Sequence, residues 1–531
     1  MPSASAWRVV AALAVLAALA AHALPPDRPA DKAEADRVKA ALPELEKLAR
    51  GALKRTGIPG LAITVVHRDR VVYLKGLGTR QAGKDEPVGA DTVFPWASVS
   101  KPLTTTVLAA LVGEGVIGWD DRVSDLDPGF RLSEPWVSRE LTLRDLLCHR
   151  SGLPDHAGDL LEDLGYSGPE VRRRLALVRP ASSFRSAYAY TNMGFSEAGV
   201  SAARRAGKSW EDLAEAKLFK PLGMKSASYR YKDLAAARDR ARLHVPVEGV
   251  QAVKNKGRWV ARYDRDPDAQ APAGGASGSA RDMARWLRLL LAGGQLDGKQ
   301  IIPAAALAEA RRPHITTSFD PATGRAGFYG LGWNVNYDDH GRVTWRHSGA
   351  FGLGARTEVA LLPGEGLGIA VLVNASPTGL PEALTRAFFD LVHDGKVSRD
   401  WFAVADGMFE RAMKEMYPGK DYTRPPARPS PALSNGAYVG TYRSAYLGEA
   451  TVVEKGGALH LILGPKKLSH PLRHYDRDSF TYQPEGEMAG GPTLATFTVG
   501  ADRKATRLRV EHLCVDGHGT FTRTGPAKPQ P

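Results

Sequence analysis

The sequence predicts an α+β domain followed by a small all-β domain. Strand-like segments lie near both ends of the long N-terminal part, and helix-like segments lie between them. Beyond a Pro-rich stretch, hydrophobic residues alternate with a period of two. The 531 residues are too many for one ordinary domain, and 43% hydrophobic residues suit a globular protein with a sizeable core.

The N-terminus predicts a secreted, periplasmic protein. After Arg8 the chain reads VVAALAVLAALAA and then Ala21-His22-Ala23, which has the form of a signal-peptidase site. We interpret residues 1–23 as a signal peptide cleaved near Ala23, with a retained N-terminal anchor as the alternative. No later stretch resembles a transmembrane helix, so we expect no stable membrane insertion after cleavage.

Composition weighs against nucleic acid, metals and cofactors. The net charge is +13, yet Lys and Arg are scattered and often adjoin Asp or Glu, with no nucleic-acid-binding motif. We expect a solvated cationic surface. No metal-ligand spacing is present, so we predict no metal and no cofactor. The two cysteines, Cys148 and Cys514, lie in different predicted domains, and spacing alone cannot establish a bridge between them.

The first predicted domain, residues 24–416, begins with a helix and a hairpin. Residues 31–57 have helical spacing, interrupted at Pro43 and ended near Gly57, and residues 60–78 form two β-rich arms around the turn HRDR. Helical patterns follow in residues 141–154, 209–224 and 279–294. Strand patterns return in residues 329–339, 342–350 and 356–376, and a last helix is predicted at residues 380–395.

A linker and a β domain complete the chain. Residues 417–432 are rich in Pro and charge, which is typical of an extended linker. In residues 433–525, segments such as ALHLIL and LATFTV alternate with turns such as EKGGA. This pattern predicts a small barrel or sandwich of antiparallel strands.

Ser98 and Lys101 form an S-x-x-K pattern where a helical segment starts. Lys101 would lie one helical turn from Ser98 on the same face, and a helix N-terminus favours an oxyanion. A lysine can activate a serine only if burial or nearby positive charge depresses its pKa. Because about one such match is expected by chance, the alternative is a Ser98 helix cap beside a solvated Lys101.

Two further segments complete the candidate site. Tyr190 and Asn192 form Y-x-N, in which the phenol could relay a proton and the amide could bind substrate; an inward-packed loop tyrosine is the alternative. His347 and Gly349 form H-x-G in a predicted strand. Gly349 would let a substrate backbone pair with the strand edge, and the Ala350 N–H could face a carbonyl oxygen.

These three motifs, in this order, resemble those of the class C β-lactamase and penicillin-binding-protein-like serine hydrolases, which include CubicO-type peptidases and esterases. The surrounding FPWASVSK, LTLRDLLCHRSGLP, YAYTNMGF and YGLGW are also similar, across roughly residues 35–395. The tail with YVGTY resembles the lipocalin-like C-terminal domain of many such proteins. The resemblance implies a β-lactamase/transpeptidase-like domain, with an antiparallel sheet flanked by helices plus a helical subdomain, and then a small β-barrel.

The resemblance also implies roles for the site residues. Ser98 would attack an acyl carbon, and Lys101 and Tyr190 would share the acid and base work. Asn192, His347, Gly349 and Ala350 would bind substrate, with the Ser98 and Ala350 N–H groups as the oxyanion hole. Water would then release the acyl group.

One departure concerns His347, where the β-lactamases and many D,D-peptidases of this family carry lysine. A histidine is mostly neutral near pH 7, which favours an esterase, D-amino-acid peptidase or amidase over an efficient β-lactamase. A buried structural role for His347 is the alternative. His149 and Ser151 are interpreted as structural residues, Ser100 as a nucleophile only if the register is misread, and Trp96 and Trp333 as lining either cleft or core.

The predicted function is therefore hydrolysis of an amide, ester or lactam bond in a small molecule or peptide, including cell-wall-derived ones, through an acyl-enzyme on Ser98. The alternatives are a penicillin- or peptidoglycan-binding protein that acylates without turnover, and an inactive scaffold. The sequence leaves the substrate and the oligomeric state open.

Overall fold

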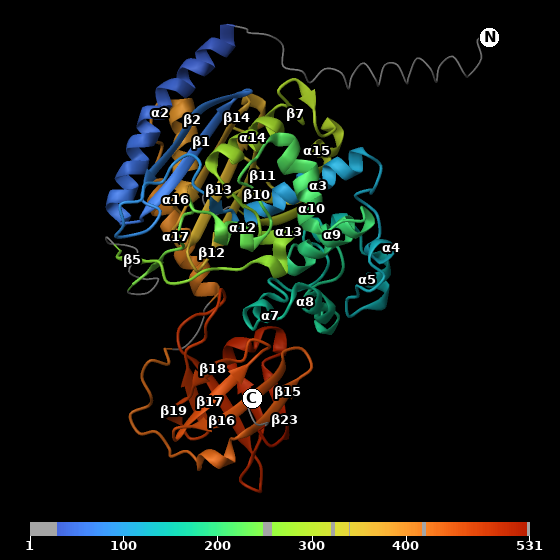
Figure 1. Ribbon diagram of the computed structural model, residues 1–531, viewed down its shortest axis with the longest axis vertical. Helices are drawn as coiled ribbons and strands as arrows, with labels where there is room; N and C mark the ends of the chain where they lie inside the picture. Colours follow the sequence, from blue (N-terminus) through green and yellow to red (C-terminus); the bar gives the residue numbers. More distant parts are fainter. Residues whose placement is uncertain (1–28, 248–256, 320–323, 339, 417–420, 528–531) are drawn as a thin grey trace, which may run out of the picture.

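The computed structural model describes residues 29–247, 257–319, 324–338, 340–416 and 421–527. The predicted signal peptide and the first four residues of the predicted linker lie outside these ranges. The chain forms a large α+β part and a smaller β part that lies against one end of it (Figure 1). Within the described residues, none of the helices has both the length and the apolar character that a membrane crossing needs.

An eight-stranded antiparallel sheet forms the centre of the large part, in the order β2-β1-β14-β13-β12-β11-β10-β9. The strands are β1 (Gly60–His67), β2 (Arg70–Gly78), β9 (Ile315–Phe319), β10 (Ala326–Tyr329), β11 (Asn334–Tyr337), β12 (Val343–Phe351), β13 (Ala355–Leu362) and β14 (Leu367–Val373). Strands from the two ends of the large part meet where β1 pairs with β14, from Leu61 opposite Val373 to His67 opposite Leu367. Every residue of β1 and β14 is buried, since helices cover both faces of the sheet here.

Helices pack on both faces of this sheet (Figure 1). α2 (Pro29–Thr56) packs on α16 (Leu380–Asp394), which contacts β13, β14 and α17 (Trp401–Met416). α14 (Ala280–Leu291) lies against β1, β2 and β14 on the opposite face.

The prediction that Pro43 interrupts the first helix was wrong, because α2 continues through it. Proline removes one backbone hydrogen bond and strains an interior turn, at a cost of about 3 kcal/mol. The apolar stripe of α2, including Val38, Leu45 and Ala49, is buried against the sheet and α16, and this packing keeps the helix continuous. The helix ends next to Gly57, as predicted, where φ is +70°.

The helical region lies between β2 and β9 in the chain. Its helices are α3 (Ser100–Gly113), α4 (Val123–Leu126), α5 (Pro135–Glu140), α6 (Leu143–Leu147), α7 (Asp159–Asp163), α8 (Gly168–Arg174), α9 (Asn192–Arg205), α10 (Trp210–Ala214), α11 (Lys220–Leu222), α12 (Tyr231–Ala236), α13 (Ala271–Gly274), α14 and α15 (Ala304–Ala310). Short strands β3 (Phe94–Pro95), β4 (Val245–Pro246), β5 (Trp259–Val260), β6 (Ser277–Gly278), β7 (Gln295–Leu296) and β8 (Lys299–Gln300) pair two by two. The bundle around α3 and α9 meets the sheet at the 3₁₀ turn that precedes α3.

The C-terminal part is a nine-stranded antiparallel sheet that curls into a nearly closed barrel. Its strands are β15 (Gly440–Ser444), β16 (Gly448–Lys455), β17 (Ala458–Leu463), β18 (Leu468–Pro471), β19 (Arg473–Asp476), β20 (Ser479–Tyr482), β21 (Thr493–Val499), β22 (Ala505–Val510) and β23 (Thr520–Gly525). The two edge strands, β18 and β19, follow each other in the chain across one residue, Leu472. The predicted fold, α+β followed by a small all-β barrel, is confirmed.

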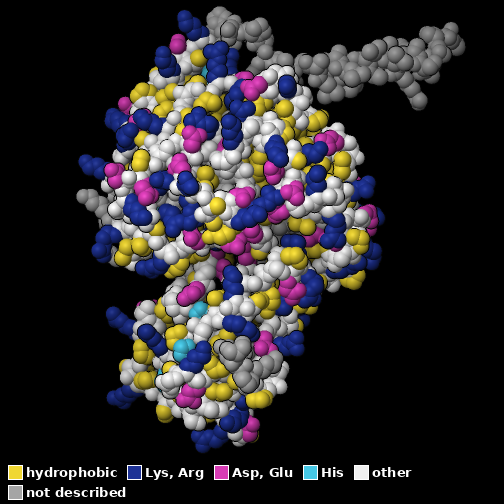
Figure 2. Space-filling model, viewed as in Figure 1, with side chains coloured by type: hydrophobic (Ala, Val, Ile, Leu, Met, Phe, Trp, Pro, Cys, Tyr) yellow, Lys and Arg dark blue, Asp and Glu magenta, His cyan; other side chains and the backbone are white. Residues whose placement is uncertain are grey.

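Charged side chains are mixed on the surface. On the face drawn in Figure 2, Lys and Arg are spread over both parts and interspersed with Asp and Glu. This distribution agrees with a solvated cationic surface rather than a single basic stripe.

Candidate functional site

The backbone turn that carries Ser98 is tightly held. Ala97 has φ +46°, in the left-handed region that residues other than glycine seldom adopt, and it opens the 3₁₀ helix η1 (Ala97–Val99). The Ser100 hydroxyl fixes this conformation by donating to the Ala97 carbonyl at 2.6 Å and accepting from the Ala276 N–H at 2.9 Å. Ser100 is thus a buried structural residue, and its hydroxyl is already engaged.

The helix-cap interpretation of Ser98 does not hold. The N-cap residues of η1 and α3 are Trp96 and Val99, so Ser98 lies inside the turn rather than at either cap position. Its Oγ is contacted by two side chains instead, those of Lys101 and Tyr190.

Lys101 lies on the first turn of α3, and its side chain is fully buried. Its Nζ is 3.3 Å from Ser98 Oγ, 2.7 Å from Asn192 Oδ1 and 3.1 Å from the Ala273 carbonyl oxygen. Burial lowers the pKa of Lys101 to about 7, against an opposing effect of the Asp159 carboxylate. A substantial fraction of the amine is therefore unprotonated near neutral pH.

Tyr190 contributes a phenol to the same oxygen. Its hydroxyl donates to Ser98 Oγ at 2.8 Å, and Lys101 Nζ lies 4.4 Å from the centre of its ring. Burial raises the pKa of Tyr190 well above its ordinary value; the Ser98 hydrogen bond opposes this, whereas Asp159 adds to it. The phenol therefore remains a proton donor at neutral pH.

Asn192, the first residue of α9, is held at both ends of its amide. Its Oδ1 accepts from Lys101, and its Nδ2 donates to Asp159 Oδ2 at 2.8 Å. The same carboxylate oxygen lies 2.8 Å from His156 Nδ1. The sequence analysis did not single out Asp159 or His156, because a carboxylate of α7 and a turn histidine belong to no recognisable motif.

Gly349 brings strand β12 against the Ser98 turn. A Cβ atom at this position would lie 2.2 Å from the Trp96 carbonyl oxygen and 3.1 Å from the Ser98 nitrogen. Only glycine permits this approach, which places the backbone of Gly349 and Ala350 beside the Ser98 N–H. On its other side Ala350 pairs with Arg356 of β13.

His347 of β12 is buried, and both ring nitrogens are engaged. Nδ1 lies 2.7 Å from the Ser348 carbonyl oxygen and therefore donates, which leaves Nε2 to accept from the Tyr329 hydroxyl at 2.9 Å. Burial and the neighbouring Lys101 lower the pKa of His347 to about 3. This geometry favours the structural alternative over direct contact with a substrate.

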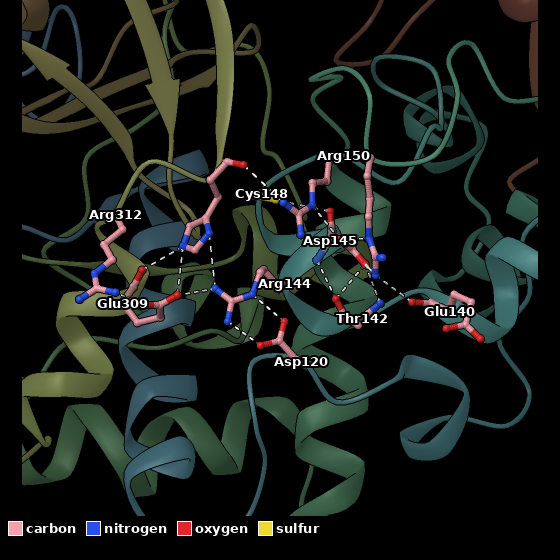
Figure 3. Close-up of polar contacts among 11 residues, drawn as sticks. Asp120, Glu140, Thr142, Arg144, Asp145, Cys148, Arg150, Glu309 and Arg312 are labelled. Atoms are coloured by element: carbon pink, nitrogen blue, oxygen red, sulfur yellow. Dashed lines mark hydrogen bonds and ion pairs between the residues drawn. The ribbon is translucent and has the colours of Figure 1, made fainter.

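A buried carboxylate, Asp145, fixes the loop that leads to Tyr190. Figure 3 shows Asp145 between Thr142, with which it forms a capping box at the start of α6, and Arg150, whose Nε donates to it at 2.7 Å. Arg185 Nη2, from the loop before Tyr190, donates to it at 2.8 Å. Because Arg150 and Arg185 both bind the buried Asp145 carboxylate, they hold the two loop segments next to each other.

His149 continues this support. Its Nδ1 accepts from the Thr191 N–H at 3.1 Å, and its ring centre lies 4.6 Å from that of Tyr190. The prediction that His149 is a packing residue agrees with its complete burial. Trp96 and Trp333 are likewise core residues rather than cleft walls.

The C-terminal barrel reaches the end of strand β12. The loop between β20 and β21 donates the Glu487 and Met488 N–H groups to Asp163 of α7, at 2.9 and 2.8 Å. The Glu487 carboxylate accepts from the Gly352 N–H, two residues beyond Ala350. The barrel thus contacts the turn that follows the strand bordering the Ser98 turn.

A buried charge cluster accompanies this contact, which we call the interdomain cluster: Glu162, Asp163, Arg265 and Glu487. Arg265 Nη2 lies 2.8 Å from Glu162, and its Nε lies 3.7 Å from Glu487. A second contact lies beside it, where the Tyr166 hydroxyl donates to the Leu447 carbonyl at 3.0 Å.

Within the residues that the structure describes, no group of three or more His, Cys, Asp and Glu side chains is arranged to hold a metal ion. The two cysteines are both free thiols. The side chains of Lys101 and Tyr190 both contact Ser98 Oγ. This arrangement can supply a nucleophile, a base and an acid at one oxygen atom.

A family model described as Beta-lactamase matches residues 45–392, which is more than half of the chain. The chain belongs to the beta-lactamase family. The three motifs lie inside the matched range, and the predicted resemblance is confirmed. A second model, described as a domain of unknown function (DUF3471), matches residues 424–523, which include all but the end of the last barrel strand.

Relatives of this beta-lactamase family member include hydrolases. The chain is 28% identical over 423 residues to the unguisins hydrolase of Aspergillus campestris, covering 75% of each chain. It is 28% identical over 385 residues to the esterase EstB of Burkholderia gladioli, covering 64% of this chain and 92% of the esterase.

A solved structure shares the fold across almost its whole length. The octameric penicillin-binding protein homologue from Pyrococcus abyssi has a TM-score of 0.56 and 19% identity, covering 88% of this chain and 98% of that one. At this identity the likeness concerns the fold alone.

Proposed function

We propose that this family member is a secreted serine hydrolase that forms an acyl-enzyme on Ser98 and hydrolyses an ester, amide or lactam bond. The observation that carries the proposal is the buried Lys101 amine beside Ser98 Oγ, with its pKa lowered to about 7. A lysine in this state can take a proton from serine at neutral pH.

The surroundings of Lys101 suit a base. A neutral amine has two N–H groups and one lone pair, and the Asn192 and Ala273 oxygens, at 2.7 and 3.1 Å, can accept both hydrogens. The lone pair is then left for the Ser98 hydroxyl. In the acylation step Ser98 Oγ bonds to the acyl carbon while its proton passes to Lys101.

Tyr190 is the proposed acid. Its protonated phenol already contacts Ser98 Oγ, so it lies near the bond that breaks as the leaving group departs. It gives the leaving group its proton and recovers one from Lys101. The N–H groups of Ser98 and Ala350 are the proposed oxyanion donors, since Gly349 brings the two segments together. Water then attacks the acyl-enzyme by the reverse route.

The substrate class follows from His347. A neutral, internally bonded histidine supplies no cation for a substrate carboxylate, so esters and amides without a carboxylate beside the reacting bond are favoured over β-lactams. Similarity to a protein named an esterase and to one named an unguisins hydrolase agrees with this choice. Secretion, and access to cell-wall-derived peptides, rest on the N-terminal sequence alone.

Intact-mass spectrometry tests the proposal. The protein is mixed briefly with p-nitrophenyl acetate or, separately, with benzylpenicillin, and Ser98→Ala is treated alongside as p-nitrophenol release is followed. We expect a burst and a transient acetyl adduct on Ser98, absent from Ser98→Ala.

The other outcomes distinguish the alternatives. A stable penicillin adduct without turnover would favour a binding protein that acylates only. Equal release by wild type and Ser98→Ala, with no adduct, would exclude Ser98 as the nucleophile and favour an inactive scaffold.

A further inference from the structure

A line of hydrogen bonds runs from the Lys101 amine to a histidine outside the three motifs. Lys101 Nζ donates to Asn192 Oδ1 at 2.7 Å, and Asn192 Nδ2 donates to Asp159 Oδ2 at 2.8 Å. His156 Nδ1 lies 2.8 Å from the same Asp159 oxygen. Four side chains from α3, α9, α7 and the turn before α7 are therefore connected.

Asp159 determines which way the Asn192 amide faces. An ionised carboxylate only accepts hydrogen bonds, so the amide must turn its NH₂ group to Asp159 and its oxygen to Lys101. With the opposite orientation the NH₂ group would face the amine and compete with Ser98 for its lone pair. The direction of this amide is thus a condition for Lys101 to act on Ser98.

Asp159 also places a negative charge near Lys101, and His156 balances it. The other Asp159 oxygen, Oδ1, is buried and has no hydrogen-bond partner within the part of the chain that the structure describes. Burial lowers the pKa of His156, but the hydrogen bond and charge of Asp159 outweigh burial and raise it overall. When His156 is protonated, its positive charge offsets the Asp159 carboxylate, whose negative charge otherwise acts on the Lys101 amine.

The local backbone supports this pairing. His156 has φ +58°, and its N–H donates to the Tyr190 carbonyl at 2.7 Å. Gly158, with φ +97°, is the N-cap of α7 and lies against Met193, so that α7 starts beside α9. The strained turn thereby brings the histidine and the carboxylate to one end of α9.

Other titratable or charged groups surround the hydrogen-bonded side chains from Lys101 to His156 and affect the pH dependence of Lys101. Asp155 lies 3.8 Å from His156 Nε2, and Glu162 and Asp163 interact with Asp159 on α7. His149 and His347 interact electrostatically with Lys101. Arg356 acts through its charge on Tyr190 and His347. Both His149 and His347 have lowered pKa values, since each is buried. They remain neutral while Lys101 titrates.

We propose that Asp159 and His156 are a positioning pair, in which Asp159 orients the Asn192 amide toward Lys101 and His156 offsets the carboxylate charge beside the amine. This inference rests on the proposed function, because it acts through Lys101 on Ser98. Neither residue touches the reacting atoms.

Two substitutions separate orientation from charge. Asp159→Asn keeps an oxygen that can accept from Asn192 and His156 but removes the negative charge, so Lys101 should lose its proton at lower pH. His156→Gln removes the positive charge and leaves Asp159 uncompensated, so Lys101 should lose its proton at higher pH. His156→Lys restores a cation and should return toward wild type.

The experiment measures the rate of Ser98 labelling by a fluorophosphonate probe between pH 5 and 9. We expect the midpoint to shift by about half a pH unit or more, downward in Asp159→Asn and upward in His156→Gln. Asp91→Asn is the matched control, since it removes one carboxylate from an exposed pair with Arg281 and should shift nothing. Thermal melting confirms that each variant is folded.

Several results would overturn the inference. Midpoints that coincide in all variants, or that move in the same direction in Asp159→Asn and His156→Gln, would contradict charge balance beside Lys101. If Asp159→Asn does not fold, the His156→Gln and His156→Lys pair decides alone. A wild-type protein that the probe never labels would instead reject the proposed function, and the positioning pair with it.

Discussion

Two buried cations of this protein have opposite surroundings. Lys101 is contacted by the neutral oxygens of Ser98, Asn192 and a backbone carbonyl, and burial lowers its pKa to about 7. Burial also lowers the pKa of Arg265, but Glu162 and Glu487 outweigh it and the net shift is upward. The comparison teaches that the charge of the partners, rather than burial itself, decides whether a buried cation can release its proton.

The short helix α7 connects these two regions. Asp159 at its start reaches Asn192 in the Ser98 site, whereas Glu162 and Asp163, one turn later, belong to the interdomain cluster. The carboxylates of this one helix therefore lie both in the Ser98 site and in the interdomain cluster.

The largest expected effect comes from giving the Ser98 site a permanent cation. Lys101→Arg places a guanidinium, which stays protonated, where the proposed base lies. We expect kcat/KM for a p-nitrophenyl ester to fall about 10³-fold, because the base is lost. A variant within tenfold of wild type would show that Lys101 is not the base.

The second prediction removes the cation of the interdomain cluster. At pH 8, where Glu487 is ionised, Arg265→Met leaves Glu162 and Glu487 buried without their counter-charge, and we expect a loss of about 3–5 kcal/mol in the free energy of unfolding. Urea denaturation monitored by circular dichroism measures this, with Arg265→Lys as a milder control. Equal stability of Arg265→Met and wild type would contradict a structural role for the pair.

The third prediction concerns the activity of the wild type against pH. Because the pKa of Lys101 is lowered to about 7, the unprotonated amine is lost as pH falls below that value. We expect kcat/KM to drop about tenfold for each pH unit below 7 and to level off above it. A rate that stays constant from pH 5 to 8 would mean that another group accepts the Ser98 proton.

The smallest expected effect concerns Glu487. Burial raises the pKa of this carboxyl to about 7, against the attraction of Arg265, whereas its ordinary value is 4.5. The folded protein therefore keeps a proton that the unfolded chain loses, so this group stabilises fully below about pH 4.5 and its contribution is lost as pH rises through 7.

Glu487→Gln removes that dependence while keeping an oxygen for the Gly352 N–H. We expect wild type to lose about 2.5 kcal/mol of stability relative to the variant between pH 5 and 8. Urea denaturation at the two pH values measures the difference. A stability difference between wild type and variant that is the same at both pH values would show that Glu487 is ionised throughout this range.

Much of the architecture could be predicted from local patterns. The period-two alternation of Leu459, Leu461 and Leu463 corresponds to β17, where all three are buried. The order of strand-like and helix-like segments predicted a sheet built from strands at both ends of the large part, and β1 does pair with β14. Helix α17 was missed, because composition was taken to change after residue 395 although WFAVADGMFERAMKEM follows.

The sequence by itself determined the fold class and the order of the three motifs, because periodicity and the residue types of S-x-x-K, Y-x-N and H-x-G are local properties. Only the tertiary structure decided what these residues meet. In the folded chain Lys101 is buried among neutral oxygens, and both ring nitrogens of His347 are hydrogen-bonded within the protein. Asp159, which also contacts His156, accepts a hydrogen bond from the Asn192 amide. Proton affinity depends on burial and on partners that lie far away in the chain, so no spacing along the sequence could have shown it.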